Sequence, residues 1–351
     1  QNSEHMVCRF GGRALTGATW RSVSQILCSP GPLGVGNVTV EVADNGRDFS
    51  STFLTLEVLA TPTALSVIPS NGWSTGGTPV TVLGTNFVTP FVGCVFGNIE
   101  VDCERIDRSK LHCLAPSQTT GIVRVLAKVW EGDSAPDLRA DAPTFRYMEP
   151  WTIERFIPST GWTDGGTALT VVGKHFVQTD GVSCKFGSVE SVTAILITSS
   201  EIICSTPRMS EGDVVVEVTG NALDYSADGA VFAVRTGAYV TSVEPSQGVG
   251  SISQTVTVLG QHFDSVDTIV CKIGSSASGV NARLLSSSAV LCNLPPSRGI
   301  GNVTLEVSNN GVDFGVSFVL FQFMPDTYVT SLVPSSDTLW GGSRVTVTGQ
   351  G

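Results

Sequence analysis

The chain has 351 residues, a length that indicates several domains. Its 38 Gly and 17 Pro against 4 Met favour many short strands and turns over long helices. The formal net charge of −11, from 20 basic and 31 acidic residues, repels phosphate backbones and argues against a nucleic-acid partner. No apolar run reaches the roughly 18 residues of a membrane-spanning helix. Attachment to a membrane and the secretory signal are therefore expected only in segments outside this sequence.

A repeat of about 88 residues organises the sequence. Each copy opens with a Pro-Ser pair and a turn, followed by a strand of alternating apolar and polar residues that ends in Gly-x-x-Phe. A first cysteine, a second cysteine about twenty residues later and a Gly that begins a β-branched strand come next, in the same order. The prolines that mark the four openings are Pro69, Pro158, Pro245 and Pro334.

The alternation within the repeat predicts the fold class. Short strands with a period of two residues, separated by turn signals, predict an all-β chain of tandem immunoglobulin-like sandwiches arranged as a rod. Val80 and Val82 are expected in a core, with Thr81 facing water. The triplets 44–46 (Asp-Asn-Gly) and 309–311 (Asn-Asn-Gly) predict tight hairpin turns. The aromatic residues expected on the closing strands are Phe53, Phe145, Phe232 and Phe318.

The spacing of the repeat predicts three complete domains, at residues 60–147, 148–237 and 238–324. Residues 1–59 then form the C-terminal part of a domain, and residues 325–351 form the N-terminal strands of another. This pattern indicates a segment of a longer repeat chain. The alternative is that the two ends complete each other between copies of the chain by strand addition, so that copies join end to end.

The opening turn reads Pro-Ser-x-Gly-Trp-x-x-Gly-Gly-Thr at residues 69–78 and 158–167, whereas residues 246–251 lack the Trp and the Gly-Gly-Thr. With the Gly-x-x-Phe strand end and the Cys-x-Phe-Gly step, this turn resembles the IPT/TIG family of immunoglobulin-like domains, found in plexins and fibrocystin-like surface proteins. The resemblance implies extracellular recognition, adhesion or spacing, with protein partners. The family also has intracellular members among transcription factors, but the paired cysteines and the acidic charge argue against that branch.

Eight of the nine cysteines form pairs at the same place in each repeat. A disulfide that closes a loop of about twenty residues contributes about 3 kcal/mol in the chain-entropy model. A zinc site is the alternative, but zinc ligands are usually separated by about two to four residues, a spacing that these pairs lack. Disulfides predict the oxidising secretory pathway and a location outside the cell or on its surface. The predicted pairs are Cys8–Cys28, Cys94–Cys113, Cys184–Cys204 and Cys271–Cys292.

Cys103 is left over from this pairing. Three interpretations are open: a buried free thiol, a shuffled pairing with Cys94 or Cys113, and a disulfide to another chain. The third would matter if the protein assembles.

Two sequons, at residues 37–39 (Asn-Val-Thr) and 302–304 (Asn-Val-Thr), occupy equivalent positions of their repeats. They predict N-linked glycans on Asn37 and Asn302. Since Thr39 and Thr304 are expected to face outward, the glycans would disfavour lateral packing at that surface.

The sequence lacks the motifs that carry catalysis. It has no Gly-x-Ser-x-Gly, P-loop, His-Glu-x-x-His or Gly-x-Gly-x-x-Gly pattern. His175 and His262 share one repeat position, where Asn86 stands in another copy, which is typical of a structural role. We therefore predict no enzymatic activity, no cofactor and no metal. The acidic segment 131–141 is expected to be a solvated loop, with a calcium-binding junction loop as the alternative.

These observations favour a structural or adhesive extracellular protein, in which the repeats form part of a stalk, filament or surface fibre. The alternative is a ligand-binding segment of a receptor ectodomain, and a weaker one is an accessory module of a carbohydrate-active enzyme. Trp73, Trp162 and Trp340 stand in the opening turns. They are expected either to cover the end of their own sandwich or to pack on the preceding domain and fix the angle between domains.

Overall fold

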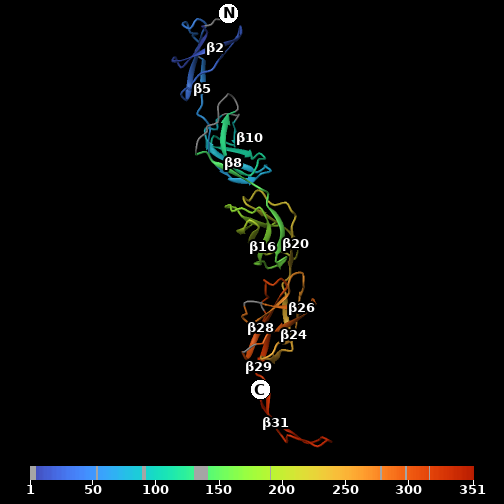
Figure 1. Cartoon of the computed structure of the whole chain (residues 1–351). Coiled ribbons are helices and arrows are strands. Elements are labelled where there is room, and N and C mark those ends of the chain that lie inside the picture. The colour runs from blue at the N-terminus through green and yellow to red at the C-terminus, as the bar shows by residue number, and fades with distance from the viewer. Residues whose placement is uncertain are drawn as a thin grey trace. The chain divides into compact units, whose positions relative to one another are not determined.

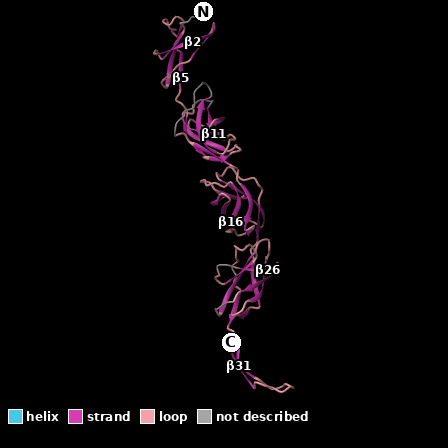
Figure 2. Cartoon of the chain, in the orientation of Figure 1, coloured by secondary structure: helices cyan, strands magenta, loops and turns pink. Residues whose placement is uncertain are grey.

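The protein is built from β-strands. Its structure, a computed structural model, describes residues 5–52, 54–88, 92–129, 141–189, 191–276, 279–296, 299–315 and 317–351. All regular elements of these ranges are strands (Figures 1 and 2). Within the same ranges, no helix is long and apolar enough to cross a bilayer. The chain divides into two compact units, Gln1–Met148 and Glu149–Gly351, which are described separately.

The N-terminal part of the first unit is a five-stranded sheet with the order β3-β2-β1-β4-β5. Its buried residues are Cys8, Phe10 and Ala43. The strand β2 pairs first with β1 and then, from Ala18 onward, with β3. The strands are β1 (Val7–Phe10), β2 (Ala14–Ser22), β3 (Gln25–Cys28), β4 (Gly36–Ala43) and β5 (Leu54–Val58).

The first sandwich completes this unit, and it has two layers that share one strand. One layer has the order β6-β8-β11-β10 and the other the order β10-β9-β12-β13-β7. The first half of β10 pairs with β9 and its second half with β11, so the strand passes from one layer to the other. The strands are β6 (Thr63–Ile68), β7 (Asn71–Trp73), β8 (Pro79–Thr85), β9 (Val92–Phe96), β10 (Ile99–Arg105), β11 (Lys110–Leu114), β12 (Gly121–Val129) and β13 (Thr144–Met148).

The second unit contains two sandwiches with the same strand order, followed by a hairpin. The second sandwich has β14 (Thr152–Ile157), β15 (Thr160–Trp162), β16 (Ala168–Lys174), β17 (Ser183–Phe186), β18 (Val192–Thr198), β19 (Glu201–Ser205), β20 (Gly212–Thr219) and β21 (Val231–Arg235). The third has β22 (Tyr239–Glu244), β23 (Gln247–Val249), β24 (Gln254–Gln261), β25 (Val270–Ile273), β26 (Val280–Ser286), β27 (Ala289–Leu294), β28 (Gly301–Ser308) and β29 (Leu320–Met324). The hairpin is β30 (Tyr328–Val333) with β31 (Thr346–Gln350). The predicted tandem all-β sandwich fold is confirmed.

The alternation of the sequence decides which side chains fill the cores. Val80 and Val82 are buried while Thr81 between them is half-buried, as the period of two residues predicts. Phe145 and Phe232 are fully buried on their closing strands.

The prediction for Phe318 is wrong, because this side chain is 89% exposed. Phe321 takes the core position instead and is fully buried. It stands opposite Val303, just as Phe145 stands opposite Val123 in the first sandwich. The closing strand begins at Leu320, two residues after Phe318, so the register places Phe321 inward. Phe53 lies outside the described residues.

The Gly-x-x-Phe motif allows a close contact between two strands and an aromatic ring. A Cβ atom on Gly173 would stand 2.0 Å from the carbonyl oxygen of Thr152 and 2.6 Å from Cζ of Phe176. Gly84 and Gly260 have equivalent surroundings in the other two sandwiches. The glycine therefore lets the first strand lie against the second while the buried Phe closes the end of the core.

The position before that Phe explains the recurrence of Asn and His. Asn86, His175 and His262 have positive φ values of 63°, 66° and 60°, and Asn and His are among the residues that adopt this left-handed conformation more readily. The side chains of Asn86 and His175 also contact the carbonyl oxygens of Thr61 and Pro150, each at 3.2 Å. These residues hold the turn to the chain that enters the first strand, which is a structural role.

The predicted tight Asn-Gly hairpins are wrong. The strands β4 and β5 are joined by residues 44–53, and β28 and β29 by residues 309–319. The Asn side chain folds each loop on itself: Oδ1 of Asn310 accepts hydrogen bonds from the amides of Val312 and Asp313. An Asn that caps its own following amides stabilises such a turn without requiring a two-residue hairpin.

We expect Gly173→Ala to destabilise the second sandwich by about 2–3 kcal/mol, because the added methyl forces β14 and the Phe176 ring away from β16. Hydrogen exchange of the β16 and β19 amides measures this local stability. The matched control is Lys174→Ala, which removes an exposed ion pair with Glu154 and should leave the protection of these amides almost unchanged, because solvent screens exposed pairs. Equal protection in Gly173→Ala and the unmodified protein would contradict the packing argument.

Candidate functional site

Disulfides between the first and the second cysteine of the repeat recur in three of the folded parts. Bonds join Cys8 to Cys28, Cys184 to Cys204 and Cys271 to Cys292, with sequence separations of 20, 20 and 21 residues. These are the pairs expected from the repeat. Cys184 lies on β17 in one layer and Cys204 on β19 in the other, so the bond crosses the core.

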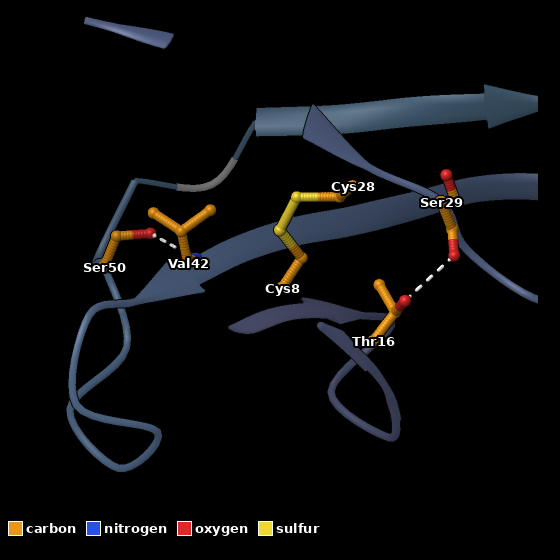
Figure 3. The surroundings of a disulfide bond; sticks show 6 residues. All are labelled: Cys8, Thr16, Cys28, Ser29, Val42 and Ser50. Atoms are coloured by element: carbon orange, nitrogen blue, oxygen red, sulfur yellow. Dashed lines mark hydrogen bonds between the residues drawn. A yellow bond between two sulfur atoms is a disulfide. The ribbon is translucent and has the colours of Figure 1, made fainter. Parts of the chain in front are cut away.

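The surroundings of the first of these bonds are shown in Figure 3. The Thr16 hydroxyl donates to the Ser29 carbonyl oxygen at 2.9 Å, and the Val42 amide donates to the Ser50 hydroxyl at 3.2 Å. Both contacts hold chain segments that flank the disulfide.

The first sandwich differs from the prediction. Cys113 is bonded to Cys103, not to Cys94, and Cys94 is a buried free cysteine. The reason is the register of β10 and β11: Cys103 stands directly opposite Cys113, with a Cα–Cα distance of 4.5 Å. Two cysteines in this position satisfy disulfide geometry within one layer. The expected Cys94–Cys113 pair is corrected, and so is the expectation of an unpaired or interchain Cys103: of its three interpretations, the structure has the pairing with Cys113.

A signal for this pairing was present in the sequence. The residue ten positions before the second cysteine is Ala18, Ala194 or Ala282 in the other repeats, and in the structure each of these alanines stands opposite its cysteine. Cys103 holds this position in the first sandwich. An alignment of the repeats on their second cysteine would therefore have placed Cys103 beside Cys113.

Three sulfur atoms lie close together in this sandwich. The Sγ atom of Cys94 is 3.5 Å from that of Cys113, and the sulfurs of Cys94, Cys103 and Cys113 all lie within 4.8 Å of one another. Burial raises the pKa of the Cys94 thiol to about 12, because the thiolate loses its hydration in an apolar core. A disulfide occupies two of the three sulfurs, so this set is not a metal site as it stands.

A second recurring feature is a polar loop after the strand that pairs with the first cysteine's strand. In each of these loops, the side-chain Nδ2 of an Asn donates a hydrogen bond to the carboxylate of an Asp three residues later, at 2.8 Å. Each loop is followed by an aromatic ring that covers a cationic side chain from the first cysteine's strand. The Asn and Asp pairs are Asn45 and Asp48, Asn221 and Asp224, and Asn310 and Asp313.

In the second unit, the loop of the third sandwich contacts the second sandwich. Asn310 Nδ2 donates to the carbonyl oxygen of Thr160 at 2.9 Å, and the Thr167 hydroxyl donates to the Asp313 carboxylate at 2.6 Å. Thr167 is fully buried and Thr160 is 5% exposed. Buried hydroxyl and backbone groups require such partners, and here the partners belong to the neighbouring sandwich.

Asp267 strengthens the same junction from a second loop. Its Oδ2 atom accepts hydrogen bonds from the amide and the hydroxyl of Thr160, both at 2.9 Å, and its Oδ1 atom accepts one from the Ser159 hydroxyl at 2.8 Å. Hydrogen bonds to an ionised carboxylate are shorter and stronger than those between neutral groups. Residues 159–160 thus form hydrogen bonds with polar groups from two loops of the third sandwich.

Trp162 lies at this junction as well. Its indole is next to Gly237, where a Cβ atom would stand 3.0 Å away, and next to Gly315 of the third sandwich, where a Cβ atom would stand 3.8 Å away. The side chain therefore contacts the linker and the domain that follow its own sandwich. This differs from the alternative in which the opening-turn Trp packs on the preceding domain, because β15 pairs with the last strand β21 and lies at the C-terminal end of the sandwich.

The predicted glycan sites lie on exposed side chains. Asn37 and Asn302 are exposed near the beginnings of β4 and β28, whereas Thr39 and Thr304 are half-buried. Their use by a glycosylation enzyme stays a prediction.

The remaining candidates do not form a common site in the described part of the chain. His112 is exposed on β11 opposite Thr81, and His5 is exposed near the N-terminus. Of the acidic segment 131–141, residues 131–140 lie outside the described residues. A shallow hollow lined by Asp164 and Arg208 holds an ion pair of 3.6 Å between these two side chains.

Each of the three sandwiches matches a known domain family. The model of the IPT/TIG domain family matches residues 62–147, 152–233 and 238–323. The chain is 24% identical over 331 residues to human fibrocystin-L, covering 93% of this chain and 7% of that protein. It is 27% identical over 207 residues to human plexin-A3, covering 56% of this chain and 11% of that protein. The chain thus spans only a small part of these relatives.

Among solved structures, the chain resembles the full extracellular region of plexin A4 at 16% sequence identity. The match covers 93% of this chain and 35% of that chain, with a TM-score of 0.43.

We expect Cys103→Ala to restore the pairing of the other repeats, so that Cys94 bonds to Cys113 and no free thiol is left. Since the closed loop roughly doubles in length, the new bond restricts the unfolded chain more and should raise the free energy of unfolding by about 0.6 kcal/mol relative to the bond from Cys103 to Cys113. Peptide mapping without reduction checks the connectivity. Cys94→Ala is the matched control and should keep the bond from Cys103 to Cys113. Free thiols on both Cys94 and Cys113 in Cys103→Ala would show that the two layers do not bring these sulfurs into bonding distance.

Proposed function

Because the chain belongs to the IPT/TIG domain family, we propose that it is a non-enzymatic extracellular segment whose sandwiches act as oriented spacers in a longer cell-surface or secreted protein. The spacer is part of a stalk, filament or surface fibre. The observation that carries the proposal is the polar junction in the second unit, where Asp267, Asn310 and Asp313 of the third sandwich engage residues 159–167 of the second.

The chemistry of the junction supports a spacer. A flexible connection between two domains needs no specific contacts, whereas these carboxylates and amides are directed at particular backbone and hydroxyl groups. Hydrogen bonds to charged groups contribute about 1.5–3 kcal/mol each when they are shielded from water. Several of them, together with the Trp162 contact, oppose rotation of one sandwich against the other.

Disulfides support the extracellular part of the proposal. Eight cysteines are bonded in the structure, and bonds of this kind persist in the secretory pathway and outside cells but are rare in the cytosol. End-to-end association of copies remains a prediction of this proposal.

A second candidate function is ligand binding as a segment of a receptor ectodomain, and the similarity to plexin-A3 favours it. The two differ in their requirements: a spacer needs stiff junctions, while a ligand-binding segment needs an exposed recognition surface. A junction that stays rigid when the chain is alone in solution would support the first candidate.

We expect Asp267→Ala to increase hydrogen exchange at the Thr160 amide by about tenfold or more, because this amide donates to the Asp267 carboxylate across the junction. Mass spectrometry of peptides covering residues 159–162 in the whole chain measures the change. Asp264→Ala is the matched control, since that carboxylate accepts only from the Val266 amide of its own loop among the described hydrogen bonds. Unchanged exchange in Asp267→Ala would exclude a persistent junction and with it the spacer.

We expect the chain, made in a eukaryotic secretory host, to carry two N-linked glycans that peptide N-glycosidase removes. Asn37→Gln and Asn302→Gln should each remove one glycan, because both side chains are exposed. Intact mass before and after the enzyme is the measurement. A secreted product without glycans on either residue would contradict the prediction while leaving the spacer proposal in place.

A further inference from the structure

The first sandwich holds a free cysteine beside a disulfide that it is able to attack. Cys94 is fully buried and its Sγ atom lies 3.5 Å from Sγ of Cys113. Cys113 is at present bonded to Cys103. In the other three folded parts the cysteine equivalent to Cys94 is the partner of the second cysteine, so the fold accommodates both pairings.

We propose that this cluster is a thiol–disulfide exchange site, in which Cys113 changes its partner from Cys103 to Cys94 and the released Cys103 thiol becomes a modification site for disulfide-bearing molecules. The external substrate class is a disulfide, either of a small molecule or of another protein chain. Its reaction with Cys103 yields a mixed disulfide.

The internal step is balanced without an external oxidant. The thiolate of Cys94 attacks Sγ of Cys113, the bond between these two sulfurs forms, and the bond between Cys103 and Cys113 breaks. The electron pair leaves on Cys103, which takes up the proton that Cys94 released. In the second step the Cys103 thiolate attacks an external disulfide, forms a mixed disulfide with one half and releases the other half as a thiolate.

The exchange changes how accessible the free thiol is, because Cys94 and Cys103 lie in different surroundings. Cys94 lies in the apolar core cluster of the sandwich, while Cys103 is only half-buried. Residues 103–105 of β10 pair with β11, whereas residues 99–102 pair with β9. Cys103 thus lies where β10 becomes the edge strand of its layer. The exchange moves a free thiol from the core to a sheet edge, where an external disulfide has access to it.

Two features keep the exchange slow in the folded domain. The first is geometric: an attacker in line with a disulfide of about 2.04 Å would stand about 5.5 Å from the leaving sulfur, but Sγ of Cys94 is within 4.8 Å of Sγ of Cys103. A rotation of the Cys113 side chain is therefore needed before the sulfurs align.

The second feature is the protonation of Cys94, whose pKa burial raises to about 12. Below that pKa, the thiolate fraction rises tenfold for each unit of pH, and the exchange rate follows it. The described core cluster that contains Cys94 is apolar except for Cys103, Cys113 and Tyr147. Burial also raises the pKa of Tyr147 to about 12, so this group stays neutral as well. No charge in that cluster competes with the desolvation.

The test is differential alkylation of the whole chain with its disulfides intact. Light N-ethylmaleimide is added to the native protein at pH 7.5 or 8.5, and heavy reagent is added after denaturation in acid. Cleavage after Glu100 and after Lys110 places each of the three cysteines on its own peptide. We expect light label on Cys103 with Cys94 bonded to Cys113, appearing about tenfold faster at pH 8.5 than at pH 7.5.

Three outcomes would overturn the proposal. They are light label on Cys94 with the bond from Cys103 to Cys113 intact, heavy label alone on Cys94 after prolonged native incubation, and label on Cys103 at a rate independent of pH. All three are read from the unmodified protein, so the test does not depend on a variant that folds.

Two variants and a second probe separate the internal step from the external one. With oxidised glutathione as the probe, the unmodified protein should gain one glutathione, on Cys103. Cys94→Ala should gain none, because it has no internal attacker, and Cys103→Ala should gain none, because it has no released thiol. Glutathione on Cys103 of Cys94→Ala would show direct attack from outside and would overturn the role of Cys94.

Discussion

A disulfide on the second cysteine of each repeat is the constraint on which the sandwiches depend. Cys28, Cys113, Cys204 and Cys292 are all bonded, although the partner of Cys113 comes from a different strand. A domain of this size buries a thin core, so the hydrophobic free energy only slightly exceeds the entropy lost on folding. A covalent bond raises the free energy of unfolding by restricting the unfolded chain, and it does so without enlarging the core.

The contacts between the second and third sandwiches are of another kind. The cores are apolar and separate, whereas the junction in the second unit is built from carboxylates, an amide and hydroxyl groups. Apolar contacts tolerate sliding, but hydrogen bonds to a buried threonine hydroxyl fix position and direction. Within the second unit, the two sandwiches thus keep separate cores while polar contacts fix the orientation of one against the other, as expected for repeats that contact their neighbours.

The cysteines show how much of the disulfide pairing a repeat pattern predicts. The repeat identified the cysteine positions correctly, and in three folded parts the expected partners are the bonded ones. In the first sandwich the pattern favoured Cys94, because the other copies use that position. Cys113 is bonded instead to Cys103, because these two residues stand opposite each other in the register of the antiparallel strands β10 and β11. Sequence spacing alone does not state which residues face each other, and only the comparison with Ala18, Ala194 and Ala282 suggests it.

The sequence by itself determined the all-β class, the alternation that buries Val80 and Val82, and the four openings of the repeat, because these depend on residues near one another in the chain. Only the tertiary structure decided the partner of Cys113, the burial of Phe321 in place of Phe318, and the contact between Asp267 and Thr160. Each of these depends on strand register or on the approach of segments far apart in sequence. Packing of the whole domain decides which of these distant residues meet, and a local sequence pattern does not predict it.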